Sequence, residues 1–127
     1  MKITEPLRLN YEFARVYKRG VFTSGRCLVL HAFTRTSYVR RGRTPVPRSV
    51  NRLGVTSSRK IRGAVKRNRV KRLLRENYRL LEPELRGGYD LILMMKDLDP
   101  LPDYSQIKKE MRSLFKRSGL IRTGETT

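Results

Sequence analysis

The chain has 127 residues and a formal net charge of +19, because 30 lysine and arginine residues face only 11 aspartate and glutamate residues. This length suits one domain with a hydrophobic core, and a compact domain with this charge needs a polyanionic partner. Nucleic acid meets that need better than a membrane surface, because tryptophan is absent and no basic helix carries a broad apolar face.

The single cysteine and the single histidine, Cys27 and His31, limit the chemistry further. One cysteine excludes an intramolecular disulfide, and the two residues together are too few for a zinc site. The longest apolar run, residues 91–95, is too short to span a bilayer, and the N-terminus lacks the apolar core of a signal peptide. We therefore expect a cytoplasmic protein with no membrane contact and no metal site of its own.

The N-terminal part of the chain predicts a frayed end, a helix and a strand. We expect residues 1–9 to fray. Asn10 is a suitable N-cap for a helix over 11–18, and Gly20 is available to end that helix. Apolar residues at alternate positions predict a strand over 26–35.

The middle of the chain predicts a basic loop, a strand and a long helix. Residues 36–49 mix arginines with prolines, which interrupt strand pairing, so we expect a mobile basic loop. A strand over 50–56 follows. Apolar residues spaced three and four apart predict a helix over 63–81, and Pro83 ends it.

The C-terminal part predicts a buried strand and a last helix. Residues 89–96 contain the continuous apolar run that is typical of a strand covered on both faces. Asp103 and Gln106 have the spacing of a capping box for a helix that ends near Gly119, and we expect residues 120–127 to fray. This order of elements argues for a single α+β domain with helices packed on a mixed or mostly antiparallel sheet.

The positive charge is concentrated in one part of the sequence. Residues 13–75 contain no acidic residue but nineteen lysines and arginines, fifteen of them arginine. Guanidinium groups bind phosphate through two parallel hydrogen bonds and stack on bases, so this bias favours nucleic-acid contact over solubility alone. Residues 59–72 hold eight cations where the long helix begins. On a helical projection the face opposite its apolar stripe carries Asn68, Arg72, Arg75 and Arg79.

Three motifs follow one another around this basic segment. They are Gly54-Val55-Thr56-Ser57-Ser58-Arg59-Lys60, then Ala64-Val65-Lys66-Arg67-Asn68-Arg69-Val70-Lys71-Arg72, then Arg75-Glu76. Together they resemble the signature of the bacterial ribonuclease P protein subunit. The similarity extends over most of the chain, through residues 12–20, 26–33, 89–96 and 114–117.

The resemblance implies a particular fold. It is an α-β-β-β-α-β-α sandwich with a mixed four-stranded sheet, like the second domain of ribosomal protein S5. The resemblance also implies that the basic helix joins two parallel strands by a left-handed βαβ crossover. General experience would predict the opposite hand, which is found in about 98% of such units.

The resemblance also implies a function and a set of binding residues. The chain would be the protein cofactor of ribonuclease P, in which a partner RNA with bound magnesium hydrolyses precursor tRNA to mature its 5′ end, with one protein per RNA. No catalytic residue is then expected in the chain. The residues that would bind the catalytic RNA are Arg59, Lys60, Lys66, Arg67, Asn68, Arg69, Lys71, Arg72 and Arg75. Those that would bind the single-stranded 5′ leader of precursor tRNA are Phe13, Tyr17, Lys18 and His31.

Other interpretations of these residues remain open. Phe13 and Tyr17 lie four residues apart on a short helix, so they suit core packing as well as a binding cleft. A structural ribosomal or assembly protein would share the basic surface, and a DNA-binding module would place the basic helix in a major groove. An exposed aromatic cleft distinguishes these alternatives, because only binding of a single-stranded leader requires it.

Overall fold

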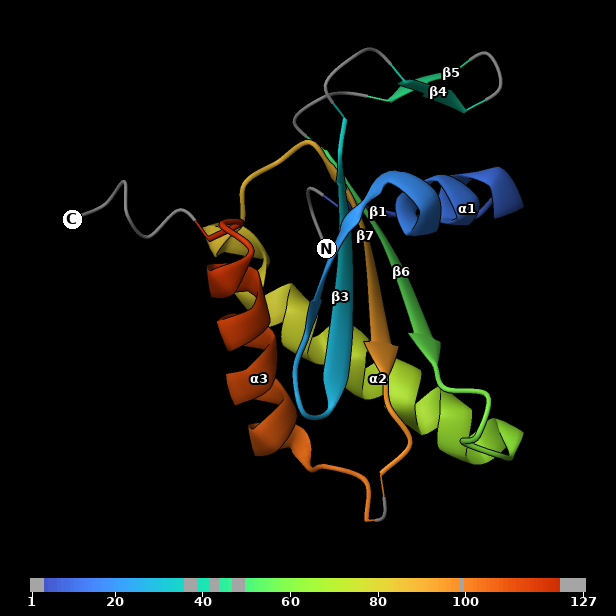
Figure 1. Cartoon of the computed structure of the whole chain (residues 1–127), viewed down its shortest axis with the longest axis vertical. Coiled ribbons are helices and arrows are strands. Elements are labelled where there is room, and N and C mark those ends of the chain that lie inside the picture. The colour runs from blue at the N-terminus through green and yellow to red at the C-terminus, as the bar shows by residue number, and fades with distance from the viewer. Residues whose placement is uncertain (1–3, 36–38, 42–43, 47–49, 99, 122–127) are drawn as a thin grey trace, which may run out of the picture.

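A five-stranded mixed sheet lies at the centre of the computed structural model, which describes residues 4–35, 39–41, 44–46, 50–98 and 100–121 (Figure 1). Its strands are β1 (Thr4–Pro6), β2 (Val21–Ser24), β3 (Leu28–Thr34), β6 (Asn51–Ser57) and β7 (Tyr89–Met95). Their order across the sheet is β1-β6-β7-β3-β2. β6 is parallel to both of its neighbours, whereas β3 is antiparallel to both of its own.

Helices cover both faces of this sheet (Figure 1). One face carries α1 (Asn10–Arg19), and the other carries α2 (Ala64–Leu81) and α3 (Tyr104–Arg117). A short 3₁₀ helix, η1 (Glu82–Glu84), extends α2 and contains Pro83. The α+β sandwich expected from the sequence is therefore confirmed.

The larger hydrophobic core lies between the sheet and the helices α2 and α3. Alternate residues of a strand face opposite sides of a sheet, so Leu28 and Leu30 of β3 point to this core together with Leu91 and Leu93 of β7. The apolar stripe predicted for α2 and the apolar face predicted for α3 meet them. The buried residues of these two helices are Val70, Leu74, Tyr78 and Leu81, and Ile107, Met111, Leu114 and Phe115.

A smaller core lies under α1 on the opposite face. It consists of Leu7, Val16 and Ile92, with Phe13 and Phe33 packed against them. Because so few apolar residues join α1 to the sheet, polar contacts must contribute to its position.

The connection from β6 through α2 to β7 has the unusual hand. Both strands run downward in Figure 1, β7 lies to the left of β6, and α2 passes behind the sheet. This arrangement is a left-handed crossover, as the family resemblance implied and as the general rule for βαβ units did not.

The chain ends are more ordered than we expected. We predicted fraying of residues 1–9, but Thr4–Pro6 forms a parallel pair with β6, and Leu7 is buried. Thr4 Oγ1 also lies 2.9 Å from the hydroxyl of Tyr78 in α2. At the other end, Ile121 pairs with Leu85, so the described structure extends two residues into the segment that we expected to fray. The sheet gains a fifth strand because β6 would otherwise have an unpaired edge.

The basic loop predicted over 36–49 contains strands. β4 (Val39–Arg41) pairs in antiparallel fashion with β5 (Thr44–Val46), whereas residues 36–38, 42–43 and 47–49 lie outside the described residues. We expected prolines to prevent such pairing. Pro45 is tolerated because β4 and β5 form a two-stranded sheet of their own, in which each strand has a free edge.

Helix capping agrees with the sequence at one helix and not at another. Asp103 and Gln106 form the predicted capping box at the start of α3, with both N···O distances at 2.9 Å. At α1, however, Leu9 occupies the N-cap position instead of Asn10. The Glu12 carboxylate accepts the backbone N–H groups of Arg8 and Leu9, at 3.0 and 3.1 Å. Glu12 is a better cap than Asn10 because a contact to its other carboxylate oxygen, Oε2, holds the side chain in place.

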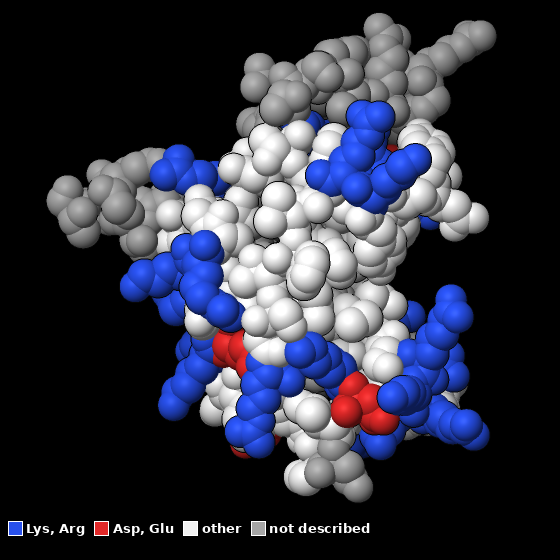
Figure 2. Space-filling view, in the orientation of Figure 1, with Lys and Arg blue, Asp and Glu red and all other residues white. Residues whose placement is uncertain are grey.

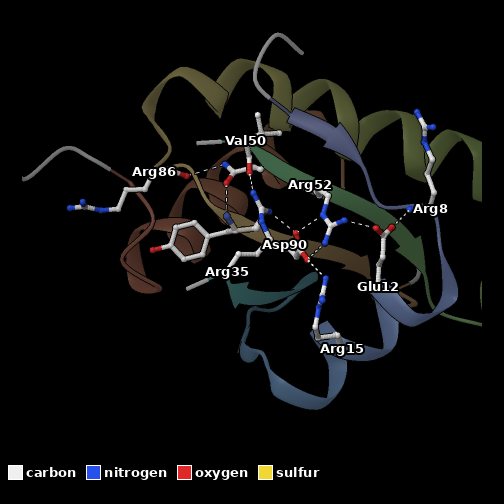
Figure 3. Close-up of polar contacts among 10 residues, drawn as sticks. Arg8, Glu12, Arg15, Arg35, Val50, Arg52, Arg86 and Asp90 are labelled. Carbon is white, nitrogen blue, oxygen red and sulfur yellow. Dashed lines mark hydrogen bonds and ion pairs between the residues drawn. The ribbon is translucent and has the colours of Figure 1, made fainter. Parts of the chain in front are cut away.

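That other oxygen belongs to a buried ionic cluster under α1 (Figure 3). Arg52 of β6 donates to Glu12 Oε2 and, at 2.6 to 2.8 Å, to both oxygens of Asp90 in β7. Arg35 donates to Asp90 Oδ1 at 2.7 Å and to the carbonyl of Val50. Arg52, Glu12 and Asp90 are fully buried, so these charges depend on one another.

Arg15 adds a third cation at the edge of this cluster. Its Nη2 atom lies 3.3 Å from Asp90 Oδ2, and its guanidinium group lies 5.3 Å from the centroid of the Phe33 ring. Arg15, Arg35 and Arg52 thus share the two carboxylates of Glu12 and Asp90. The sequence suggested that arginines in this region contact nucleic acid, but Arg35 and Arg52 hold α1 and the strands together.

We predict that Asp90→Asn destabilises the protein strongly. The substitution keeps the side-chain shape but leaves buried guanidinium groups without their shared anion, so the free energy of unfolding should fall by about 3–5 kcal/mol. Glu84→Gln is the matched control, because Glu84 forms an exposed ion pair with Arg112 and its loss should cost less than about 1 kcal/mol. Urea denaturation of both variants measures the difference, and equal effects would contradict a structural role for the cluster.

Candidate RNA interface

The first candidate surface is the basic face of α2 and the turn before it. Ile61 anchors this turn in the larger core, and the N–H of Ser58 donates to the carbonyl of Met95 at 2.9 Å. Gly63 precedes the helix with φ of +90°, a backbone conformation that residues other than glycine rarely adopt. This local structure directs the neighbouring cations outward. All nine residues predicted to bind the catalytic RNA lie on this surface, and all are exposed except Lys71, which is half-buried.

The charge distribution along α2 suits the binding of an anionic partner, although it lowers the stability of the helix. A helix N-terminus carries a partial positive charge, so acidic residues in its first turn stabilise it. α2 has none there, and Lys66 and Arg67 add positive charge instead. Arg62, which we did not assign a role, is also exposed beside them. This arrangement raises the local positive potential where a phosphate group can approach backbone N–H groups.

One predicted cation already has a partner. Arg72 Nε lies 3.1 Å from Glu76 Oε1, one helical turn further on. Because the Arg72 side chain is 81% exposed and the Glu76 side chain 43% exposed, this pair contributes under about 1 kcal/mol and salt screens it. A phosphate group can therefore replace Glu76 at little cost.

The second candidate surface is an aromatic cluster formed by Tyr17, Phe22 and His31, on the face of the sheet that carries α1. The rings of Tyr17 and His31 meet edge to face, with centroids 4.9 Å apart. Phe22 lies opposite His31 in the β2–β3 register, with ring centroids 6.0 Å apart. Tyr17 is 50% exposed and Phe22 66% exposed, so flat apolar surfaces are open to solvent. Such surfaces suit the stacking of unpaired bases.

The predicted leader-binding residues do not all join this cluster. Tyr17 and His31 do, and Lys18 is exposed next to Tyr17 on α1. Phe13 instead packs in the smaller core, where its ring fills the space left by the absent side chain of Gly54. From the sequence we did not include Phe22 in this surface. One pattern could have indicated it: Phe22 is an aromatic residue with no apolar residue two positions before or after it.

Burial changes the acid-base properties of two cluster residues. Partial burial lowers the pKa of His31 and raises the pKa of Tyr17, because desolvation disfavours the charged form of each ring. Both side chains are therefore uncharged at neutral pH. They offer ring surface to a ligand, and the neighbouring cations offer charge.

The charged groups are unevenly distributed over the surface. In Figure 2, basic side chains gather over α1 at the top and over α3 and the start of α2 at the bottom, with an uncharged area between them. Within the described residues no cluster of three or more His, Cys, Asp or Glu side chains has the geometry of a metal site. No helix in that part of the chain is long and apolar enough to cross a membrane.

A basic helix, a separate aromatic cluster and an α+β sandwich define a class of small RNA-binding proteins. The family model described as Ribonuclease P matches residues 1–119 of this chain. The ribonuclease P protein component of Clostridium botulinum (strain Loch Maree) is 39% identical over 115 residues, which cover 90% of this chain and 94% of that protein. The same component of Clostridium acetobutylicum is 34% identical, covering 91% and 89%.

Solved structures share the fold. The ribonuclease P protein of Staphylococcus aureus superposes with a TM-score of 0.71 at 24% identity, covering 92% of this chain and 97% of that one. The protein from Thermotoga maritima gives a TM-score of 0.70 at 23% identity, covering 89% and 96%. The chain therefore belongs to the ribonuclease P protein family, whose members are subunits of the RNA-based endonuclease that matures the 5′ end of tRNA.

We predict that His31 titrates below its ordinary pKa of 6.5, since desolvation favours the neutral ring. Tyr17→Ala removes the ring that covers it, so the pKa of His31 should rise towards 6.5 in this variant. Because the chain has one histidine, proton NMR follows this titration without ambiguity. A value above 6.5 in the unmodified protein would mean that a carboxylate, and not aromatic burial, controls this position.

Proposed function

We propose that this chain binds ribonuclease P RNA through the basic face of α2 and holds the 5′ leader of precursor tRNA on the aromatic cluster. The observation that supports this division is the placement of the two surfaces on opposite sides of the sheet. One protein molecule can then contact both RNAs at once, so one protein per catalytic RNA is sufficient. We expect the particle to act in the cytoplasm, where a reducing environment suits the buried thiol of Cys27.

The two surfaces differ in the kind of contact they offer. The catalytic-RNA surface proposed here consists of Arg59, Lys60, Lys66, Arg67, Asn68, Arg69, Lys71, Arg72 and Arg75, which suit phosphate groups, with Asn68 able to donate and accept hydrogen bonds. The leader surface consists of Tyr17, His31 and Lys18, with Phe22 added. Base stacking on such rings contributes about 1–3 kcal/mol per base and tolerates any sequence.

Phe13 has an indirect role in this proposal. Its ring packs between α1 and the sheet, so it sets the distance between Tyr17 and the sheet without exposing a large surface to the leader. Magnesium ions belong to the RNA-catalysed reaction, and we assign none of the described side chains to them. The protein contributes by neutralising phosphate charge and by positioning the leader.

The central test is cleavage of a precursor tRNA by a bacterial ribonuclease P RNA at low magnesium concentration, with and without this protein. We expect strong stimulation, because protein cations replace part of the ionic screening that the RNAs need. Arg67→Ala should weaken RNA binding about tenfold and reduce the slope of log affinity against log salt by about one. Lys116→Ala, an exposed cation on α3, is the control. Tight RNA binding without stimulation would favour a structural ribosomal or assembly protein.

A second prediction isolates the leader surface. Tyr17→Ala should weaken binding of precursor tRNA with a long leader by about tenfold, the effect of one lost stacking contact, and should leave binding of leaderless tRNA unchanged. Tyr11→Ala is a close control, because Tyr11 lies on the same helix and is also 50% exposed but makes no ring contact with His31. Equal losses with both substrates would place Tyr17 outside the leader path.

A further inference from the structure

A cavity of about 570 Å³, none of whose lining residues belongs to either proposed RNA surface, lies between the β2–β3 turn, the segments with Leu98 and residues 100–102, and α3. In Figure 1 these three segments meet at the lower end of the molecule, beside the start of α3. The volume falls within the range of small-molecule sites. Nothing in the family function described above uses this cavity.

The interior of the cavity is apolar. Cys27, Leu98, Leu101 and Pro102 contribute to its lining. The thiol stays uncharged, because burial and then the nearby Glu110 carboxylate raise the pKa of Cys27. Apolar, uncharged walls of this kind fit the faces of an aromatic ring.

Cations surround this apolar interior. Arg26 lies in the β2–β3 turn, and Lys109 and Arg117 lie on α3, and all three line the cavity. Arg117 also approaches the carbonyl of Ser24, at 3.4 Å. The turn itself is fixed by Lys96, whose ammonium group donates to the carbonyl of Gly25 at 2.6 Å. Three cations beside an apolar cavity match a ligand with one aromatic part and one anionic part.

Glu110 gives the cavity a hydrogen-bond acceptor. Its Oε2 atom accepts the backbone N–H groups of Cys27 and Leu28, at 2.7 and 2.5 Å. The Cys27 thiol also interacts with this carboxylate. Both backbone N–H groups use Oε2, so a ligand in the cavity can donate to Oε1 without displacing either of them.

We propose that this cavity binds one unpaired nucleotide of RNA, with the base among the apolar residues and the phosphate on Arg26, Lys109 and Arg117. The inference deepens the proposed function, because the nucleotide comes from either the precursor tRNA or the ribonuclease P RNA. The β2–β3 hairpin links the cavity to the aromatic cluster: Phe22 and Gly25 are three residues apart, about 10 Å along a strand. A single strand lying on Phe22 therefore has the cavity within reach.

The Oε1 atom of Glu110 predicts base selectivity. Adenine, cytosine and guanine carry amino groups that donate to it. Uracil has a single ring N–H between two carbonyl oxygens, which repel a carboxylate. Glu110→Gln should remove this discrimination against uracil. The two backbone N–H groups hold the amide oxygen of glutamine on their side, so its NH₂ group faces the ligand and donates to a uracil carbonyl.

The first experiment titrates the isotopically labelled protein with AMP, CMP, GMP and UMP and follows backbone amides by NMR. We expect about millimolar affinity at low salt, with shifts at Gly25 and Ser113, and about fivefold to tenfold weaker binding of UMP. Lys109→Ala should weaken binding by about fivefold. Lys108→Ala, its neighbour on the same helix, does not line this cavity and should have no effect.

The outcomes of this titration separate the possibilities. Shifts confined to Tyr17, Phe22 and His31, or equal losses in the Lys108 and Lys109 variants, would overturn the proposal. If Glu110→Gln unfolds the protein, the weaker binding of UMP by the unmodified chain still decides the role of the carboxylate. Because free nucleotides replace both RNAs, a failure here is distinct from a failure to stimulate cleavage.

The second experiment identifies the source of the nucleotide. Ser113, which lines the cavity, is replaced by p-benzoylphenylalanine, and the protein is assembled with ribonuclease P RNA and precursor tRNA before irradiation. A crosslink to the leader or to the ribonuclease P RNA supports the proposal and names the source. No crosslink to either RNA, when the same group at Tyr17 does crosslink, would overturn it.

Discussion

The sharing of Asp90 by three arginines is the contact on which the position of α1 depends. Glu12 and Asp90 come from α1 and β7, and Arg52 of β6 bridges them, so one guanidinium group joins a helix to two strands. The small apolar core under α1 cannot replace this bridge, because it contains three buried residues. Breaking such a cluster is costly, since the remaining charges stay in a medium that solvates them poorly. The position of the aromatic cluster therefore depends on these buried ion pairs.

The sheet separates two kinds of chemistry. The face under α2 and α3 is apolar and carries the larger core, which leaves the outer side of α2 free for cations. The face under α1 is smaller and partly polar, which leaves Tyr17 and Phe22 exposed. A domain of this size with so many cations would repel itself if they were gathered on one surface. Placing them at separate edges, with uncharged aromatic surface between, reduces that repulsion.

Local patterns in the sequence predicted the helices, strands and caps that depend on local interactions. The long helix α2, the alternation in β3 and the capping box of Asp103 and Gln106 depend on residues within a few positions of each other. The family motif around Arg67 and Asn68 gave the crossover hand, which periodicity cannot. The pairing of β1 and the burial of Arg52 escaped prediction, because their partners lie 47 and 38 residues away in the sequence. An arginine that pairs internally resembles one that binds RNA until its distant carboxylate is known.

The place of β7 in the sheet determines when the protein can fold during synthesis. β7 lies between β3 and β6, yet it is made after both of them, and it also carries Asp90. A growing chain that ends before residue 89 has no central strand and no anion for Arg35 and Arg52. It therefore leaves the ribosome as a basic, unpaired segment in a compartment crowded with RNA. The sheet, the internal charge balance and the separation of the two proposed RNA surfaces are then completed together, within the last third of translation.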